Sequence, residues 1–597
     1  MILESIDWTV IAIFFGVSLF IGLRLAKSAG ASSSDFFLSG RNMPWWLLGV
    51  SMVATTFSAD TPNLVTDIVR KTGVSGNWTW WVFLLTGMLT VFVYSRLWRR
   101  SGIMTDLEFY EMRYSGKAAA FLRGFRALYL GVFFNVMIMA TVSLAAIKMG
   151  SVLLGMTPVQ TLLIASVVTV IYSSLGGLKG VLITDFFQFI IAMVGSVWAA
   201  SVIVNLPEVG GLSELVTHEL VAPKLNLFPD FTDTETLIIV FIIPIAVQWW
   251  SVWYPGSEPG GGGYIAQRML SAKDEKNALG ATLFFNMANY ALRPWPWILI
   301  ALASIVMFPN LDAIQAAFPN IDPGLIDDDL AYPAMLQYLP HGLLGIVIAS
   351  LIAAFMSTIS THLNWGSSYI VNDFYKRFVN PEASEKALVN VGRFSTLALM
   401  AMSAVLALYL ESAIQAFKIL LSIGAGTGLI FILRWFWWRI NAYTEMAGMI
   451  ISLIVAIYFE LIHTRLGFTA IEDHYKLVLS VLVTTVCWLL VTFLTRPTEL
   501  KTLVSFYNTI RPHAGGWRKA LTAAKAEGMK VEPPTASKFS VQIISVILGC
   551  FTVFSAMFGI GNLLYGKNEI GLLLIALSLV GGALMIMMWR KLKLDEL

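Results

Sequence analysis

Residues 49–63 read Gly-Val-Ser-Met-Val-Ala-Thr-Thr-Phe-Ser-Ala-Asp-Thr-Pro-Asn, and they lie inside a run that begins near Pro44 and is otherwise apolar. Small hydroxyl residues, an acid and a proline therefore interrupt a stretch long enough to cross a bilayer. Unsatisfied backbone groups are costly in lipid, so a helix breaks at this depth only against protein or a watery cavity. The stretch predicts an interrupted membrane helix.

A second interrupted run lies further along the chain. It reads Ile-Pro-Ile-Ala-Val-Gln-Trp-Trp-Ser over 243–251 and leads into Tyr-Pro-Gly-Ser-Glu-Pro-Gly-Gly-Gly-Gly over 254–263. For either run alone, the alternative is that the prolines merely kink the helix. Paired interrupted segments in two halves of a membrane protein indicate instead a transporter binding site near the midplane.

The composition supports a membrane protein. Of 597 residues, 57% are hydrophobic and 13% are charged, whereas ordinary soluble chains have about 45–50% and about 25%. Apolar blocks of about 20 residues, enough to cross about 30 Å of hydrocarbon, recur along the chain. This pattern excludes a soluble enzyme, a disordered protein and a nucleic-acid binder, and it predicts an all-α, polytopic membrane fold.

We predict fifteen membrane spans, and spans two and seven, which carry the breaks, fit two five-helix repeats in inverted topology. The spans lie near 6–25, 44–69, 78–98, 120–152, 159–175, 180–205, 234–254, 277–308, 341–375, 386–410, 413–439, 442–464, 475–495, 540–562 and 570–590. The predicted division is an extra N-terminal helix and loop (1–43), the first repeat (44–205), the second repeat (206–440), peripheral helices (441–495), a cytoplasmic loop (496–539) and two C-terminal helices (540–597).

The basic residues predict the orientation. With the N-terminus outside, most of the 40 Lys and Arg residues fall in inner loops, as the positive-inside rule requires. The C-terminus and loop 496–539 are then cytoplasmic, and we expect a multi-pass protein of the plasma membrane, in a bacterium the inner membrane. Loop 496–539 is either a solvated linker on the anionic leaflet or a regulatory docking segment. The outer loop 309–340 holds five Asp residues and no Lys or Arg.

Span nine carries a polar stripe. Ala354, Ser357, Thr358 and Thr361 are spaced i, i+3, i+4 and i+7, so they share one helix face. Hydroxyl and carbonyl oxygens suit an alkali cation. Small and hydroxyl residues also favour helix packing, and both interpretations stay open. His362 is expected to be a packing or hydrogen-bonding residue rather than a metal ligand.

Two charged residues lie within spans. Asp185 and Arg293 are functional hypotheses, because ionisable groups are expensive in a membrane. The alternatives are that Asp185 pairs with an inner-loop base, such as Lys179 or an arginine of 96–126, and that Arg293 reaches an interface. The sequence contains no nucleotide-binding loop, metal-ligand cluster or catalytic triad signature, and we predict no enzymatic activity.

Several motifs in order resemble the sodium/solute symporter family over about residues 1–495. They are Arg-Asn-Met-Pro-Trp-Trp at 41–46, Ser-Ala-Asp at 58–60, Tyr172 to Gln188, Tyr-Ile-Ala-Gln-Arg-Met-Leu-Ser-Ala-Lys at 264–273, and Ala354 to Asn364 with Asp-Phe-Tyr-Lys at 373–376. The resemblance implies the leucine-transporter fold, with a ten-helix inverted-repeat core, an added first span and peripheral spans 12–15.

The resemblance also implies sites for sodium, the expected coupling ion. The first would use the carbonyl groups of Ala54, Phe57 and Ala354 and the hydroxyl groups of Ser357 and Thr358. A second, found in some members, would use Asp185, Ser357, Ser360 and Thr361, and we predict two sodium ions per solute.

The helix breaks place Thr56, Asp60, Gln248, Trp250 and Ser251 at the midplane as predicted substrate-binding residues, and the intramembrane Arg293 is expected to face them. Sugar-transporting members carry a lysine three residues before a proline where Arg293 precedes Pro296. They also carry Asn and Gln where this chain has Thr56 and Thr61, which puts a simple hexose in doubt. An arginine can hold a carboxylate bidentately, so an organic acid or acidic sugar stays open.

We therefore predict a sodium-coupled symporter that imports a small polar organic solute, namely a sugar, a sugar acid or another organic acid, by alternating access. The alternatives are a proton-coupled transporter of the same fold, an amino-acid or vitamin symporter, and, less favoured, a channel or a transporter-like sensor. The expected partners are the solute and the lipid bilayer, with no nucleic acid.

Overall fold

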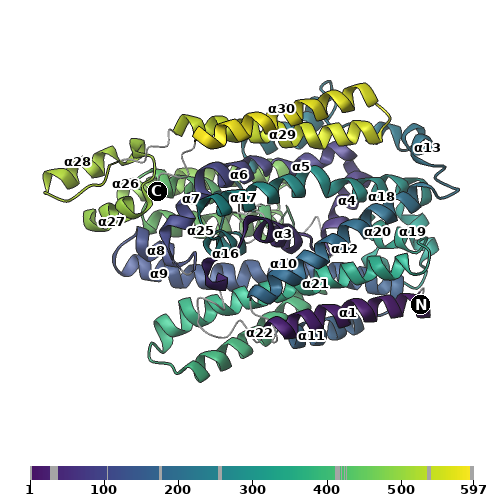
Figure 1. Cartoon of the computed structure of the whole chain (residues 1–597), viewed down its shortest axis with the longest axis horizontal. Coiled ribbons are helices and arrows are strands. Elements are labelled where there is room, and N and C mark those ends of the chain that lie inside the picture. Colours follow the sequence, from purple (N-terminus) through teal and green to yellow (C-terminus); the bar gives the residue numbers. More distant parts are fainter. Residues whose placement is uncertain are drawn as a thin grey trace.

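The computed structural model describes residues 3–26, 38–103, 105–173, 178–252, 258–410, 417–418, 420–421, 424, 426–533 and 539–591. Regular structure within these ranges is helical, apart from one isolated bridge between Met43 and Ala272. The helices form one elongated bundle, in which most of the long helices run along the longest axis (Figure 1). The predicted all-α membrane class is confirmed.

Ten helices are long and apolar enough to cross a membrane, and four shorter ones are also apolar. The ten are Val74–Ser101, Gly116–Leu154, Leu182–Val204, Glu275–Met307, Leu343–Val379, Lys386–Ala407, Ala442–Glu460, Asp473–Leu494, Phe539–Leu564 and Asn568–Trp589, and the four are Ser5–Val17, Trp45–Thr56, Pro158–Val167 and Thr234–Ala246. Each falls on a predicted span. The remaining span, 413–439, lies partly outside the described residues, and its described helix is α24 (Gly428–Phe436).

The first predicted break is present. Helix α3 (Trp45–Thr56) ends where Phe57 leaves helical geometry, with φ −78° and ψ 77°, and α4 (Thr61–Thr72) begins four residues later. Pro62 stands in the first turn of α4, where its missing N–H costs no helical hydrogen bond. The interruption therefore follows from the residues between Phe57 and Pro62.

The second predicted break is also present. Helices α14 (Thr234–Leu237) and α15 (Ile243–Ala246) lead into the short turn η8 (Gln248–Trp250), and the next helix among the described residues is α16 (Gly263–Ser271). Residues 253–257 lie outside the described ranges, as does the Gly176-Gly177 part of the family motif. A Cβ atom on Gly428 would lie 1.5 Å from the Trp250 carbonyl oxygen. Glycine at that position lets the backbone after the break approach α24.

Both breaks lie inside a core of packed helices. Helix α3 packs against α12 (Leu178–Val204), α17 (Glu275–Met287) and α21 (Leu343–Ser368), and it lies near the middle of the bundle (Figure 1). The other helices of this region include α7 (Ser95–Ser101), α8 (Glu108–Arg113), α9 (Gly116–Leu128), α10 (Asn135–Met149) and α18 (Pro294–Met307).

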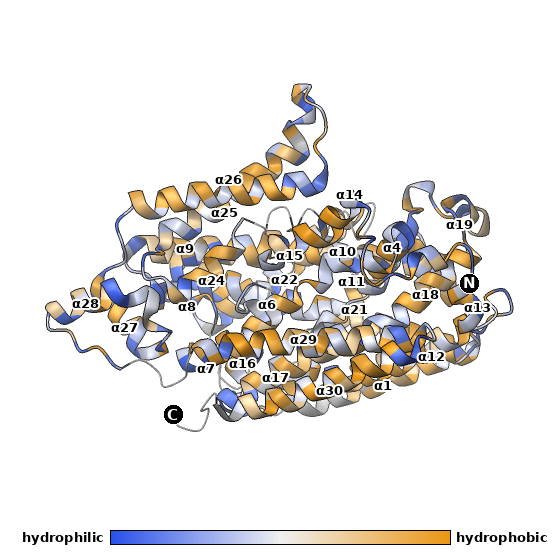
Figure 2. Ribbon diagram, turned by 90° about the horizontal axis from the view of Figure 1, so that it is seen from above, coloured by the Kyte–Doolittle hydropathy of each residue, from blue (hydrophilic) through white to orange (hydrophobic). Residues whose placement is uncertain are grey.

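The remaining helices lie around this core. They are α1 (Ser5–Ala26), α11 (Pro158–Ser173), α22 (Glu385–Ala407), α25 (Ala442–Ile457), α26 (Asp473–Leu494), α29 (Phe539–Leu564) and α30 (Asn568–Lys591). Helices α29 and α30 form a pair along one edge, with α1, α11 and α22 on the opposite edge (Figure 1). Hydrophobic residues dominate α1, α29 and α30, whereas hydrophilic residues gather towards the two ends of the bundle (Figure 2).

The described part of loop 496–539 is folded. Helices α27 (Leu500–Ile510) and α28 (Arg518–Ala526) flank a turn in which Trp517 donates to the Trp435 carbonyl oxygen at 3.1 Å. The Trp517 ring stacks on Phe506 at 5.6 Å, and the amide of Trp438 donates to the Gly516 carbonyl oxygen at 3.2 Å. The described part of the loop therefore packs against neighbouring helices, and a regulatory docking role stays a prediction.

Candidate functional site

A small cavity adjoins the first helix break. It measures about 10 Å³ and is lined by Ala54, Phe57 and Ala354, with further walls from α12 and α21. This volume is close to the lower limit for one water molecule. The structure thus brings together all three residues whose carbonyl groups were predicted to bind sodium.

The two predicted hydroxyl ligands lie one turn beyond Ala354 on the same helix. Ser357 donates to Asp185 Oδ1 at 2.8 Å, and Thr358 donates to the Thr55 carbonyl oxygen at 3.4 Å. Both side chains are buried. A hydroxyl group that donates its proton in this way keeps its oxygen lone pairs for a cation. Asp185 therefore takes the Ser357 proton and leaves the hydroxyl oxygen as an acceptor, although neither Ser357 nor Thr358 lines the small cavity in this structure.

Asp185 is fully buried and is held by two hydroxyl groups. Besides Ser357, it accepts a hydrogen bond from Ser51 of α3 at 2.7 Å. The charged side chain that acts on it electrostatically is Arg268 of α16. Sequence reasoning missed both Ser51 and Arg268. Ser51 lies one turn before Thr55 on α3, and the spacing of these two hydroxyl residues could have indicated a polar helix face. Arg268 had no comparable signal beyond its place in the motif at 264–273.

The other two residues of the predicted second site, Ser360 and Thr361, differ in their contacts. Ser360 donates to the Ser357 carbonyl oxygen of its own helix at 3.1 Å, whereas the buried Thr361 hydroxyl has no hydrogen-bond partner among the described residues. His362 Nδ1 donates a hydrogen bond to Asn135 Oδ1 at 2.5 Å. The prediction that His362 is a hydrogen-bonding residue is confirmed.

A larger cavity of about 50 Å³ lies on the other side of the break. Its polar lining comes from Thr56, Ser58, Asp60, Thr61, Thr141, Asn289 and Arg293, and its aromatic lining from Trp80 and Phe417. Three predicted substrate residues, Thr56, Asp60 and Arg293, therefore share one cavity. The lining, mostly apolar with a few convergent polar groups, is of the kind found in small-molecule sites, but such sites measure roughly 300–1,000 Å³, so a sugar-sized solute requires this cavity to widen.

Arg293 and Asp60 give this cavity one charge of each sign. The Arg293 guanidinium donates to Thr56 Oγ1 at 3.2 Å and lies over the Trp297 ring at 5.2 Å from its centre. Asp60 interacts electrostatically with Arg293, and its Oδ1 atom has no hydrogen-bond partner in the described structure. The cavity can therefore accept a hydrogen bond from a ligand at Asp60 and donate one at Arg293.

The other three predicted substrate residues do not line this cavity. Gln248 donates to the Thr79 carbonyl oxygen at 2.5 Å, and Ser251 donates its amide to the Gln248 carbonyl oxygen at 2.8 Å. Trp250 turns its carbonyl oxygen towards Gly428. In this structure Gln248 and Trp250 therefore attach the second break to Thr79 and Gly428, away from the cavity.

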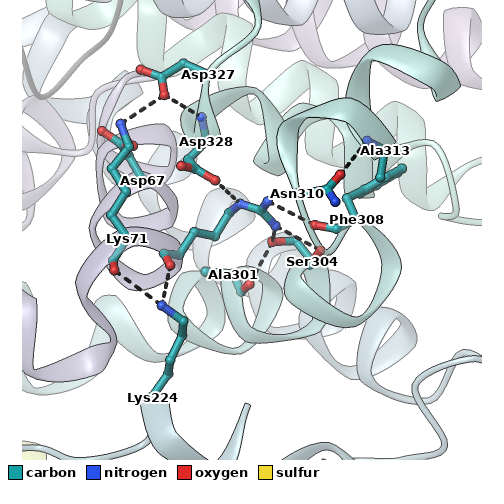
Figure 3. A network of polar contacts seen from close by, with 11 residues as sticks. Asp67, Lys71, Lys224, Ala301, Ser304, Phe308, Asn310, Ala313, Asp327 and Asp328 are labelled. Carbon is teal, nitrogen blue, oxygen red and sulfur yellow. Dashed lines mark hydrogen bonds and ion pairs between the residues drawn. The ribbon is translucent and has the colours of Figure 1, made fainter. Parts of the chain in front are cut away.

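Ion pairs join the C-terminal end of α4 to the acidic loop 309–340. Arg70 Nε lies 2.7 Å from Asp328 Oδ1, and Lys71 bridges Asp67 and Asp327 at 2.7 and 2.9 Å (Figure 3). Burial alone raises the pKa of Asp327, but the hydrogen bond from Lys71 lowers it below its ordinary value. Thr61, Leu64 and Val65 of α4 line the larger cavity, so these pairs fasten the far end of the same helix.

A second ion-pair network lies at the other end of the bundle. Glu258, just before α16, pairs with Arg126 and lies 3.6 Å from Arg434, which also lies 3.5 Å from Glu445. All four side chains are at most 2% exposed. This network ties the segment after the second break to α9, α24 and α25.

Comparison with known proteins places these features in a family context. The model of the sodium:solute symporter family matches residues 36–452. The sodium/glucose cotransporter of Vibrio parahaemolyticus is 25% identical over 480 residues, covering 78% of this chain and 87% of that protein. The sodium/glucose cotransporter 4 of Danio rerio is 26% identical over 493 residues, covering 76% and 71%.

Among solved structures, the fold is similar to that of a Na⁺-coupled sialic acid symporter in a substrate-bound, outward-open state. The TM-score is 0.65 at 20% sequence identity, with 83% of this chain and 99% of that chain covered. At this identity the similarity shows a shared fold.

Proposed function

The chain belongs to the sodium:solute symporter family, and from this premise we propose that it imports a small polar organic solute by alternating access. Sodium is the coupling ion of this family, which sets aside the proton-coupled alternative. The solute is a sugar, a sugar acid or another organic acid. The observation that carries the proposal is the pair of cavities on the two sides of one broken helix, one of ion size and one with polar and charged walls.

The first sodium ion binds beside the break, to the carbonyl oxygens of Ala54, Phe57 and Ala354 and the hydroxyl oxygens of Ser357 and Thr358. The support is the small cavity that three of these residues line, together with the orientation of the Ser357 hydroxyl towards Asp185. Oxygen ligands satisfy a hard cation, and the ion compensates the nearby carboxylate.

The second sodium ion binds at Asp185, with Ser357, Ser360 and Thr361 as further ligands. In support, Asp185 and Ser357 are in contact, and the buried Thr361 hydroxyl has no other partner among the described residues. Because Ser357 belongs to both sites, occupation of one site influences the other.

The solute binds in the larger cavity between Asp60 and Arg293. A solute with a carboxylate would pair it with the Arg293 guanidinium, and solute hydroxyl groups would donate to Asp60 and accept from Arg293. The two relatives are both sodium/glucose cotransporters, which favours a sugar or sugar derivative over an amino acid or vitamin.

The proposed architecture is two inverted five-helix repeats, over 44–205 and 206–440, with the N-terminus outside and the C-terminus in the cytoplasm of a plasma membrane. The support is one broken helix in each half and the distribution of basic residues. The outer pairs around Arg70 and the inner pairs around Glu258 would then open alternately.

The test is the melting temperature of the purified protein with a panel of sugars, sugar acids and other organic acids, each in sodium and in choline. The substrate should stabilise the protein more in sodium, and sodium should stabilise it more with substrate, because linkage is reciprocal. Arg293→Met should remove the effect of the solute and keep that of sodium. A solute effect that is equal in choline would contradict sodium coupling, and currents far above solute flux would indicate a channel.

A further inference from the structure

Asp185 is a buried carboxylate whose close contacts are neutral. The two groups that hydrogen-bond to it are the hydroxyls of Ser51 and Ser357, at 2.7 and 2.8 Å. Hydroxyl groups orient a carboxylate but do not neutralise it, and a buried charge without compensation is strongly unfavourable. An ionised Asp185 therefore needs a nearby cation in every state of the transport cycle.

Arg268 supplies a cation within reach. It is 1% exposed and stands on α16, the helix that follows the second break. Its Nη2 atom lies 3.5 Å from the hydroxyl oxygens of Ser51 and Thr55. Since Ser51 also contacts Asp185, one hydroxyl group separates the guanidinium from the carboxylate.

The contacts of Arg268 are those of a loosely held charge. It donates a hydrogen bond to Gln267, its neighbour in the chain, at 3.0 Å, and its guanidinium lies 5.5 Å from the centre of the Tyr264 ring. Within the described residues, no carboxylate oxygen lies within 4.0 Å of it. The two contacts to α3 are long for hydrogen bonds. The side chain can therefore move towards or away from Asp185 without breaking a strong ion pair.

We propose that Arg268 is an internal cation that takes the place of the second sodium ion at Asp185. The guanidinium compensates the carboxylate when sodium has left, and it withdraws towards Gln267 and Tyr264 when sodium binds. This inference rests on the proposed sodium symport and adds a residue that belongs to neither sodium site.

The physical basis is competition between two cations for one carboxylate. Like charges repel strongly where water is excluded, so sodium and the guanidinium do not compensate Asp185 together. Arginine suits this role because its charge persists when buried and its several donors can exchange one oxygen for another. By lowering the cost of an empty site, Arg268 promotes sodium release and the return of the carrier.

The position of Arg268 connects this competition to the moving parts. Ser51 and Thr55 belong to α3, the first half of one broken helix, and Arg268 belongs to α16, the last part of the other. Sodium binding would weaken the link between α3 and α16, and sodium release would restore it. Occupation of the site therefore biases how the two broken helices pack.

The test is equilibrium binding of radioactive sodium to the purified full-length protein, with choline keeping the ionic strength constant. In Arg268→Gln, we expect the second sodium ion to bind at least about tenfold more tightly, which corresponds to about 1.4 kcal/mol, and to dissociate more slowly. Arg268→Lys keeps the charge and should bind sodium nearly as the wild type does. Unchanged or weaker sodium binding in a folded Arg268→Gln protein would overturn the inference.

Arg99→Gln is the matched control. Arg99 donates to the Ala272 carbonyl oxygen at 2.8 Å just after α16, so its loss loosens the same helix without removing the charge near Asp185. Tighter sodium binding in this variant as well would assign the effect to helix mobility and contradict the charge mechanism.

A double variant keeps the inference testable if Arg268→Gln folds poorly. Asp185→Asn alone leaves the guanidinium without its counter-charge, so Asp185→Asn with Arg268→Gln should melt at a higher temperature than Asp185→Asn and bind one sodium ion. A lower melting temperature in the double variant would overturn the pairing. Absence of saturable sodium binding in the wild type would instead overturn the proposed function itself.

Discussion

Ser357→Ala and Thr358→Val remove the two hydroxyl oxygens predicted to bind the first sodium ion, and the structure ranks their effects. The Ser357 hydroxyl donates to the buried Asp185 carboxylate at 2.8 Å, whereas the Thr358 hydroxyl donates to a backbone carbonyl at 3.4 Å. Ser357→Ala therefore deletes an ion ligand and also a hydrogen bond to a charged group. Thr358→Val deletes the ligand and a long, neutral hydrogen bond.

The magnitudes follow from these contacts. A hydrogen bond to a charged group contributes about 1.5–3 kcal/mol and a neutral one about 0.5–1.5 kcal/mol. We therefore expect Ser357→Ala to raise the half-saturating sodium concentration by about tenfold to a hundredfold, and Thr358→Val by about threefold to tenfold. Because Ser357 is shared, its loss should also weaken the second sodium site.

The assay is the melting temperature of each purified variant against sodium concentration at constant ionic strength. Ser403→Ala is a suitable control, because Ser403 is buried and donates only to the Met400 carbonyl oxygen at 2.9 Å. It should keep the sodium dependence of the wild type. Wild-type sodium dependence in both site variants would show that the hydroxyl stripe serves helix packing and does not bind sodium. A larger effect in Thr358→Val than in Ser357→Ala would refute the role assigned to Asp185.

Three further predictions follow from the surrounding contacts. Arg293→Met should weaken binding of an anionic solute by about 2–5 kcal/mol while preserving sodium-dependent melting; unchanged solute affinity excludes Arg293 from the site. Asp328→Asn removes the 2.7 Å partner of Arg70, so a cysteine at Leu64, which lines the cavity, should react faster with an impermeant thiol reagent; an unchanged rate means that this pair does not hold the outer end closed. Trp517→Ala should release the docked segment, seen as faster proteolysis within 500–526; equal protease resistance would show that the Trp435 contact is dispensable.

The helix breaks and the hydroxyl face could be predicted because each depends on local sequence. Proline, glycine and an acid in an apolar run specify an interruption, and the i, i+3, i+4 spacing specifies a helix face. Residues Ala54, Phe57 and Ala354 come together because these two local features pack against each other. The contact between Asp185 and Ser357 was expected from the resemblance and from depth in the membrane.

Other contacts depend on the path of the chain, which no local pattern gives. Arg268 follows a glycine-rich segment without helical periodicity, so its approach to Ser51 could not be predicted, and the expected partners of Asp185 were different ones. Gln248 was placed in the substrate site by its position in a broken helix, yet its side chain binds Thr79. Trp517 lies in a loop of polar composition, so its burial in a hydrophobic contact could not be predicted from that composition.

The most direct measurement is the number of sodium ions that the purified protein binds at equilibrium, with radioactive sodium in a choline background. We expect saturable binding of two ions per chain, one ion in Asp185→Asn, and strongly weakened binding in Ser357→Ala. Potassium should compete poorly at both sites. Sodium binding that is unsaturable, or that neither substitution changes, would contradict a sodium symporter with its ion sites beside the first helix break.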